Sequence, residues 1–119
     1  MTWADVLEVL QARELVGAAD FTVRNVAAAD LLSDILASRK EDFVILTGQT
    51  SPQAIRTAIT VGGLGVVIVR GKQPPPESVG LAQNYGVPLA VTDRMMFEAC
   101  VAVGSLLWSS PSSKNSSTA

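Results

Sequence analysis

Three short loops hold most of the side chains that could bind a small ligand. Each loop follows an apolar run and precedes an expected helix: Thr47-Gly48-Gln49-Thr50, Arg70-Gly71-Lys72 and Thr92-Asp93-Arg94. The glycines allow a ligand to approach the backbone closely. Arg70, Lys72 and Arg94 attract negative charge, and the N-terminus of each following helix also favours anions. This chemistry predicts a site for a phosphate or a carboxylate.

The same residue types have a second explanation. Thr, Ser and Asp at the start of a helix accept hydrogen bonds from free backbone N–H groups, so these could be ordinary strand-to-helix connections. The two explanations differ in where the three cations lie. Convergence of Arg70, Lys72 and Arg94 on one place favours a ligand site, and divergence favours simple helix capping.

The composition excludes most catalytic and metal chemistry. The chain of 119 residues has no histidine, which removes Ser-His-Asp and Cys-His catalysis and imidazole zinc sites. The single Cys100 excludes an internal disulfide and a multi-cysteine cluster, and we expect it to be a buried, inert thiol. Asp30 and Asp34 share a face of an expected helix, where we interpret them as a solvated helix start. We therefore expect no enzyme activity, no cofactor and no metal.

Charge and hydropathy limit the partners. Nine Lys and Arg against eleven Asp and Glu give a net charge of -2, so no basic surface is expected for nucleic acid. The longest apolar runs are far shorter than the roughly 20 residues that cross a bilayer. The N-terminus lacks the basic region of a secretory signal. We expect a cytoplasmic protein without a membrane segment.

A repeated strand-loop-helix order predicts how the loops are positioned. Apolar runs at 43–46, 64–69 and 87–91 are each followed by one of the loops and then by a helix. Strands that are apolar along their whole length are covered on both faces, and their alternation with helices is typical of a parallel sheet. We predict a single three-layer α/β/α domain with a mainly parallel central sheet over 1–108, followed by a disordered serine-rich tail at 109–119.

Other elements complete this prediction. We expect helices at 2–10 and 30–38, and two short strands at 14–17 and 22–26 around a turn. Ile55, Ala58 and Ile59 should form the buried face of the helix that opens at Ser51-Pro52. The last helix should bury Phe97, Cys100, Val101, Gly104 and Leu107. Hydrophobic residues make up 48% of the chain, so we also expect a self-complementary apolar patch and a homodimer.

From residue 43 to residue 103 the chain resembles the DRTGG domain. The resemblance is carried by the following residues, in this order and spacing: Val44-Ile45-Leu46-Thr47-Gly48, 54–58, Val67-Ile68-Val69-Arg70-Gly71, Pro75 or Pro76 with Glu77, Ala82, Gly86-Val87-Pro88 and Thr92-Asp93. Residues 30–37 are similar to the helix that precedes this block in stand-alone members. The five-letter string that names the family does not occur, and Met95-Met96 stand where the family often has a small hydroxyl residue. The resemblance extends over most of the chain and leaves out only the tail.

The resemblance implies a regulatory or oligomerisation module. Such domains occur in phosphotransacetylases, in the N-terminal region of HPr kinase/phosphorylase and beside CBS domains in some inorganic pyrophosphatases. It implies a non-catalytic domain that dimerises and senses a small anionic ligand, such as a nucleotide or a phosphorylated metabolite. The alternative is a ligand-free interaction module acting with a sensor kinase or an iron-only hydrogenase system, because stand-alone members are similar to proteins encoded near both. No kinase activity is implied, since the chain has no P-loop.

Overall fold

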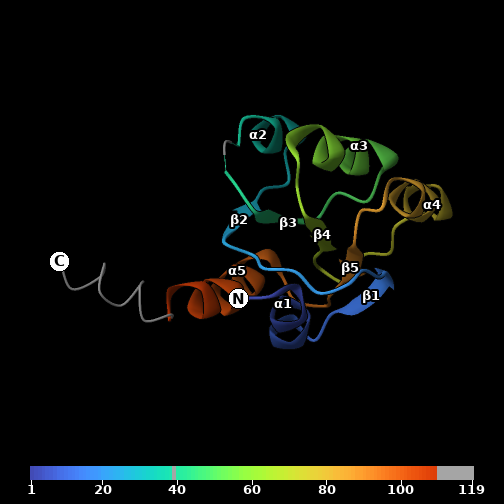
Figure 1. Cartoon of the computed structure of the whole chain (residues 1–119). Coiled ribbons are helices and arrows are strands. Elements are labelled where there is room, and N and C mark those ends of the chain that lie inside the picture. The colour runs from blue at the N-terminus through green and yellow to red at the C-terminus, as the bar shows by residue number, and fades with distance from the viewer. Residues whose placement is uncertain (39, 110–119) are drawn as a thin grey trace.

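A five-stranded sheet with helices on both faces forms the body of the protein (Figure 1). The computed structural model describes residues 1–38 and 40–109, so the predicted disorder of the tail falls almost wholly outside the described residues. The elements are α1 (Trp3–Leu10), β1 (Arg13–Val16), β2 (Asn25–Ala28), α2 (Leu32–Leu36), β3 (Phe43–Thr47), α3 (Pro52–Val61), β4 (Gly65–Ile68), α4 (Pro76–Tyr85), β5 (Leu89–Val91) and α5 (Met96–Trp108).

The sheet is mainly parallel, as predicted. The strand order is β1-β5-β4-β3-β2, in which β2, β3, β4 and β5 are parallel and β1 pairs antiparallel with β5. Helices α2, α3 and α4 cover one face, and α1 and α5 cover the other (Figure 1). Every residue of β3, β4 and β5 is buried, as the uninterrupted apolar runs require. The predicted three-layer α/β/α class is confirmed.

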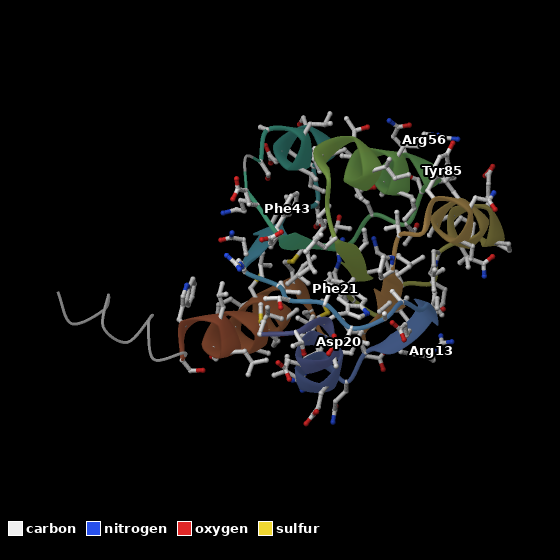
Figure 2. All side chains as sticks on the ribbon, in the orientation of Figure 1. Arg13, Asp20, Phe21, Phe43, Arg56 and Tyr85 are labelled. Atoms are coloured by element: carbon white, nitrogen blue, oxygen red, sulfur yellow. The ribbon has the colours of Figure 1, made fainter. Side chains whose placement is uncertain are left out.

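Successive residues of the central strands divide the core into two halves. Phe43 of β3 points to the α2 and α3 side (Figure 2). Phe43 and Ile45 belong to one core cluster with Ile35 of α2 and Ile55 of α3. Val44 and Leu46 belong to the opposite cluster, with residues of α1 and α5. This division follows from the two-residue period of a strand, which sends neighbouring side chains to opposite faces.

Local signals set the ends of the helices. Thr2 and Asp5 form a reciprocal capping box at the start of α1, and hydrogen bonds from Thr2 hold the pKa of Asp5 below its usual value. Gly62 and Gly86 end α3 and α4 in the left-handed conformation that glycine adopts without strain. Ser51 occupies the N-cap position of α3, but its side chain makes no capping hydrogen bond.

The predicted strand at 14–17 is confirmed by β1, whereas the predicted bounds of the second strand, 22–26, are wrong. β2 begins at Asn25, and the two strands lie at opposite edges of the sheet. The reason is competition from the N-terminus. The amide of Val23 donates to the carbonyl of Met1 at 2.7 Å, the amide of Trp3 donates to the carbonyl of Phe21 at 2.9 Å, and the Phe21 and Trp3 rings stack. These contacts hold the 21–23 segment against α1 and the residues before it, so the second strand starts only at Asn25.

The predicted buried faces of two helices are partly wrong. Phe97 is 75% exposed and Val101 51% exposed, whereas Ala99, Val103 and Gly104 of α5 are buried. Small residues let α5 lie close to the sheet, so the helix turns its bulky side chains outward. Ile59 of α3 is likewise exposed. Among the described residues, every helix is too short or too polar to span a bilayer.

Cys100 is only half-buried, not fully buried as expected. Burial nevertheless raises the pKa of its thiol, because the uncharged form tolerates removal from water better than the thiolate does. The neutral thiol therefore predominates at neutral pH, in keeping with an unreactive cysteine.

Candidate functional site

The three predicted loops leave the same end of the sheet. β3 ends at Thr47, and the loops after β4 and β5 are joined by two backbone hydrogen bonds. Arg70 N–H donates to the carbonyl of Arg94 at 2.7 Å, and Gly71 N–H donates to the carbonyl of Thr92 at 2.9 Å. Because the carboxyl ends of parallel strands lie at the same end of a sheet, loops that are distant in the sequence come together here.

Arg70 and Lys72 both reach the first loop from the second. The Lys72 ammonium donates to the carbonyl of Gly48 at 3.2 Å. The Arg70 guanidinium lies over the α-carbon of Gly48 so closely that a Cβ atom at residue 48 would overlap with it. Arg70 takes a φ of 69° and Gly71 a φ of 66°, which folds the loop back on itself. The left-handed conformation costs a non-glycine residue such as Arg70 roughly 1–2 kcal/mol, and the backbone hydrogen bonds to the third loop hold it there.

Asp30 completes this cluster from the segment that follows β2, the fourth parallel strand. One oxygen of its carboxylate, Oδ1, accepts a hydrogen bond from Gly48 N–H at 2.8 Å. The other, Oδ2, lies 3.2 Å from Nη2 of Arg70. The side chains of Arg70 and Asp30 are 34% and 43% exposed, so this ion pair contributes only about 0.2–1 kcal/mol.

Sequence reasoning placed Asp30 elsewhere, on one helix face with Asp34. In the structure α2 begins at Leu32, so Asp30 precedes the helix and turns toward the first loop. The signal that could have revealed Asp30 is its position two residues beyond β2, at the same end of the sheet as the other loops. That signal was hidden because the strand was expected to end at residue 26.

Several predicted site residues are used to hold the loops. Thr47 Oγ1 accepts from Gln49 N–H at 3.1 Å, and the Gln49 amide group donates to the carbonyl of Asp30 at 2.7 Å. The carbonyl of Thr50 accepts from the hydroxyl of Ser78 at 2.7 Å. The hydroxyl of buried Thr92 donates to the carbonyl of Leu10 at 2.7 Å. Thr47 and Thr92 therefore position the backbone of the loops.

Asp93 and Arg94 lie at the outer side of the cluster. Both residues are exposed, and Oδ1 of Asp93 would lie 3.2 Å from a Cβ atom at Gly71. Within 1–38 and 40–109, no ion pair of the Arg94 side chain occurs. The structure thus brings two of the three predicted cations, Arg70 and Lys72, onto Gly48 and leaves the Arg94 side chain outside that contact.

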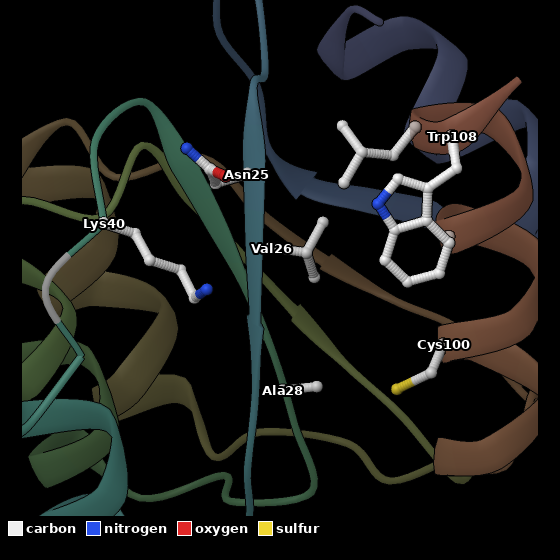
Figure 3. A pocket seen from close by; sticks show the side chains of 8 residues that line it. Asn25, Val26, Ala28, Lys40, Cys100 and Trp108 are labelled. Atoms are coloured by element: carbon white, nitrogen blue, oxygen red, sulfur yellow. The ribbon is translucent and has the colours of Figure 1, made fainter. Parts of the chain in front are cut away.

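A separate groove of about 300 Å³ lies between edge strand β2 and α5 (Figure 3). Val26 and Ala28 point into it from the strand, and Cys100 and Trp108 face them from the helix. None of the ten predicted site residues lines this groove. In the described part of the chain, no group of three or more His, Cys, Asp or Glu side chains is placed to hold a metal ion.

The fold is similar to part of one solved structure. The chain is similar to the CBS and DRTGG domains of the regulatory region of the Clostridium perfringens pyrophosphatase, a structure complexed with the activator diadenosine tetraphosphate. The TM-score is 0.69 at 17% identity, and the match covers 94% of this chain and 48% of that chain. The chain thus spans about half the length of this neighbour, and the likeness shows a shared fold. No protein-family model and no curated protein sequence matches the chain.

Proposed function

We propose that this chain is a non-catalytic, DRTGG-like regulatory domain that senses a small anion, a nucleotide or a phosphorylated metabolite, at the meeting point of its loops. One observation carries the proposal: Arg70 and Lys72 converge on Gly48. The neighbouring pyrophosphatase region supports the class of ligand, because its activator is a dinucleoside polyphosphate.

The contacts at Gly48 suit an anion chemically. The backbone N–H of Gly48 and the guanidinium of Arg70 already face one negatively charged group, the carboxylate of Asp30. Hydrogen bonds from a guanidinium to a phosphate are charge-assisted and can be bidentate. In this proposal the ligand contacts the Gly48 N–H, Arg70, Lys72 and, from the outer side, Arg94. Thr47, Gln49, Thr50, Gly71, Thr92 and Asp93 shape the loops around it.

Replacing Arg70 and Lys72 together by alanine tests the site. We expect the double variant to lose binding of inorganic pyrophosphate and ATP in isothermal titration, because both cations at Gly48 are removed. Neither side chain belongs to the core, so the melting temperature should change by only a few degrees.

The matched control for this experiment is R24A/R56A. It removes two exposed cations that belong to none of the three loops, with the same change of net charge. This control variant should bind as the wild type does. Unchanged affinity in R70A/K72A would refute the site, and equal losses in both double variants would reduce the effect to overall charge.

We further propose that two copies of the chain associate through the β2 edge. Six large apolar side chains are more than half exposed on α2, on α5 or beside them: Leu31, Leu36, Met95, Phe97, Val101 and Trp108. We call these residues the apolar surface. α2 and α5 lie over opposite faces of the sheet near β2 (Figure 1). Within the described residues, no strand pairs with the outer edge of β2. An apolar surface beside an open edge fits a second copy, and pairing across a twofold axis would cover both.

The substitution F97E tests this association. Phe97 is 75% exposed, so a charge there should leave the fold intact while opposing burial of the apolar surface. In sedimentation experiments we expect the wild type to dimerise and F97E to remain monomeric at concentrations about tenfold higher. Y85E places the same charge on an exposed aromatic residue of α4 and should dimerise normally. A wild type that stays monomeric at about 100 μM, or an F97E variant that still dimerises, would contradict the proposal.

A further inference from the structure

We infer that the carboxylate of Asp30 is a built-in occupant of the anion site, and that a ligand must displace it to bind. The inference rests on the proposed anion site and concerns its regulation. Displacement of Asp30 also releases the start of α2, so ligand binding should loosen that helix.

The first step is the way in which Asp30 is held. Each of its two carboxylate oxygens has its own partner, Gly48 N–H at 2.8 Å and Arg70 Nη2 at 3.2 Å. A backbone N–H and a guanidinium are the donors that proteins commonly offer to a bound carboxylate or phosphate. An external anion at Gly48 needs the same two donors, and therefore it competes directly with Asp30.

The second step is the weakness of this internal contact. Both members of the Asp30–Arg70 pair are partly exposed to water, which screens their attraction. The Asp30 carboxylate pairs with Arg70, whereas the Lys72 ammonium donates to the Gly48 carbonyl. A ligand with several negative oxygens can engage Arg70 and Lys72 at once. The site should accordingly select phosphates that carry two or more charges over single carboxylates such as acetate.

The third step connects Asp30 to α2. Ala29 N–H donates to the carbonyl of Leu46, which fixes the chain just before Asp30. Beyond Asp30 the chain enters α2, which has five residues and no side-chain cap at its first turn. Two contacts of Asp30 thus hold the start of this short helix at the first loop: its carboxylate accepts from Gly48 N–H, and its carbonyl accepts from the Gln49 side chain at 2.7 Å. Release of the carboxylate removes one of the two and should loosen α2, which carries Leu36 of the apolar surface and is preceded by Leu31.

Asp30→Asn tests the competition with inorganic pyrophosphate as the probe. Asparagine can still accept from Gly48 N–H but carries no charge for Arg70. We expect pyrophosphate to bind D30N about three- to tenfold more tightly than the wild type, and D30A to show an increase of the same kind. Asp34→Asn is the matched control, because Asp34 is an exposed residue of α2 and the change in net charge is identical. D34N should bind pyrophosphate as the wild type does.

Hydrogen exchange is a second measurement, and it distinguishes release of α2 from a change in net charge. A change in net charge alone would not alter the exchange of the α2 amides. Saturating pyrophosphate should accelerate amide exchange in residues 31–37 of the wild type. In D30A, which lacks the oxygen that accepts from Gly48 N–H, the same amides should exchange faster before any ligand is added and should respond little to it.

The outcomes separate this inference from the proposed site. Binding to D30N that is no tighter than binding to D34N would overturn the inference, while loss of binding in R70A/K72A would still support the site. Unchanged exchange at 31–37 in both the ligand-bound wild type and D30A would overturn the coupling to α2. If neither the wild type nor D30N binds pyrophosphate, the site and the inference fail together.

Discussion

Replacement of Trp3 by alanine is expected to lower the free energy of unfolding by about 3–5 kcal/mol, which is a large part of the stability of a domain this size. Trp3 is only 2% exposed and packs in the core between α1, α5 and the sheet. Its ring stacks on Phe21 with centroids 5.5 Å apart, and its Nε1–H donates to a carboxylate oxygen of Glu14 at 2.8 Å. Alanine would remove all of these contacts and leave a cavity that the sheet cannot close.

Urea unfolding followed by circular dichroism measures this loss. Tyr85→Ala is the control, because Tyr85 is an aromatic residue that is 64% exposed on α4, and we expect a change within about 0.5 kcal/mol. W3F should fall between the two, since it keeps an aromatic ring but loses the hydrogen bond to Glu14. A W3A variant that unfolds within about 1 kcal/mol of the wild type would show that α1 is dispensable to the core.

Trp3 also shows why part of this fold could not be predicted from the sequence. The indole holds Phe21 by stacking, and the backbone of Trp3 pairs with that of Phe21. Local patterns predict that the second strand starts at residue 22, because Thr22 and Val23 favour a strand. The pairing of the 21–23 segment with the N-terminus overrides that tendency. β2 therefore begins further along the chain, at Asn25, and lies at the edge of the sheet opposite β1.

The parallel part of the sheet could be predicted because its signals are local. The strands β3, β4 and β5 are built almost entirely from apolar residues, and proline or glycine marks the ends of the helices between them. The orientation of α5 could not be predicted in this way. Its sequence is apolar on nearly every side, so the helical period of the apolar residues does not indicate which face is buried. Packing against β2 and β3 selects Ala99 and Val103 and leaves Phe97 outside.

The same contrast applies to the candidate site. The meeting of the three loops could be predicted, because the carboxyl ends of parallel strands lie at the same end of the sheet. How their side chains are used depends on contacts between residues far apart in the chain. The Thr92 hydroxyl is committed to the carbonyl of Leu10, 82 residues away. Asp30 enters the site only because β2 turns out to be a fourth parallel strand.

Gly48→Ala should weaken pyrophosphate binding by about tenfold or more while leaving the fold intact. A Cβ atom at residue 48 would overlap with Nη2 of Arg70 and would lie 2.9 Å from its Cζ and Nε atoms. The guanidinium is the far end of a flexible side chain, so it can swing away at little cost. Gly48 is not among the residues with positive φ, and alanine therefore fits the backbone there. The Gly48 N–H remains, so the lost affinity reports the position of Arg70.

Gly80→Ala is the matched control for G48A. Gly80 lies inside α4 with open space around its α-carbon, so alanine should stabilise the helix by about 0.5–1 kcal/mol and leave the affinity unchanged. Isothermal titration of G48A, R70A and G48A/R70A then forms a double-mutant cycle. If G48A acts by displacing Arg70, the double variant should bind no more weakly than R70A alone. Additive losses would mean that Gly48 and Arg70 contribute separately, and wild-type affinity in G48A would show that Arg70 does not hold the anion from its place over Gly48.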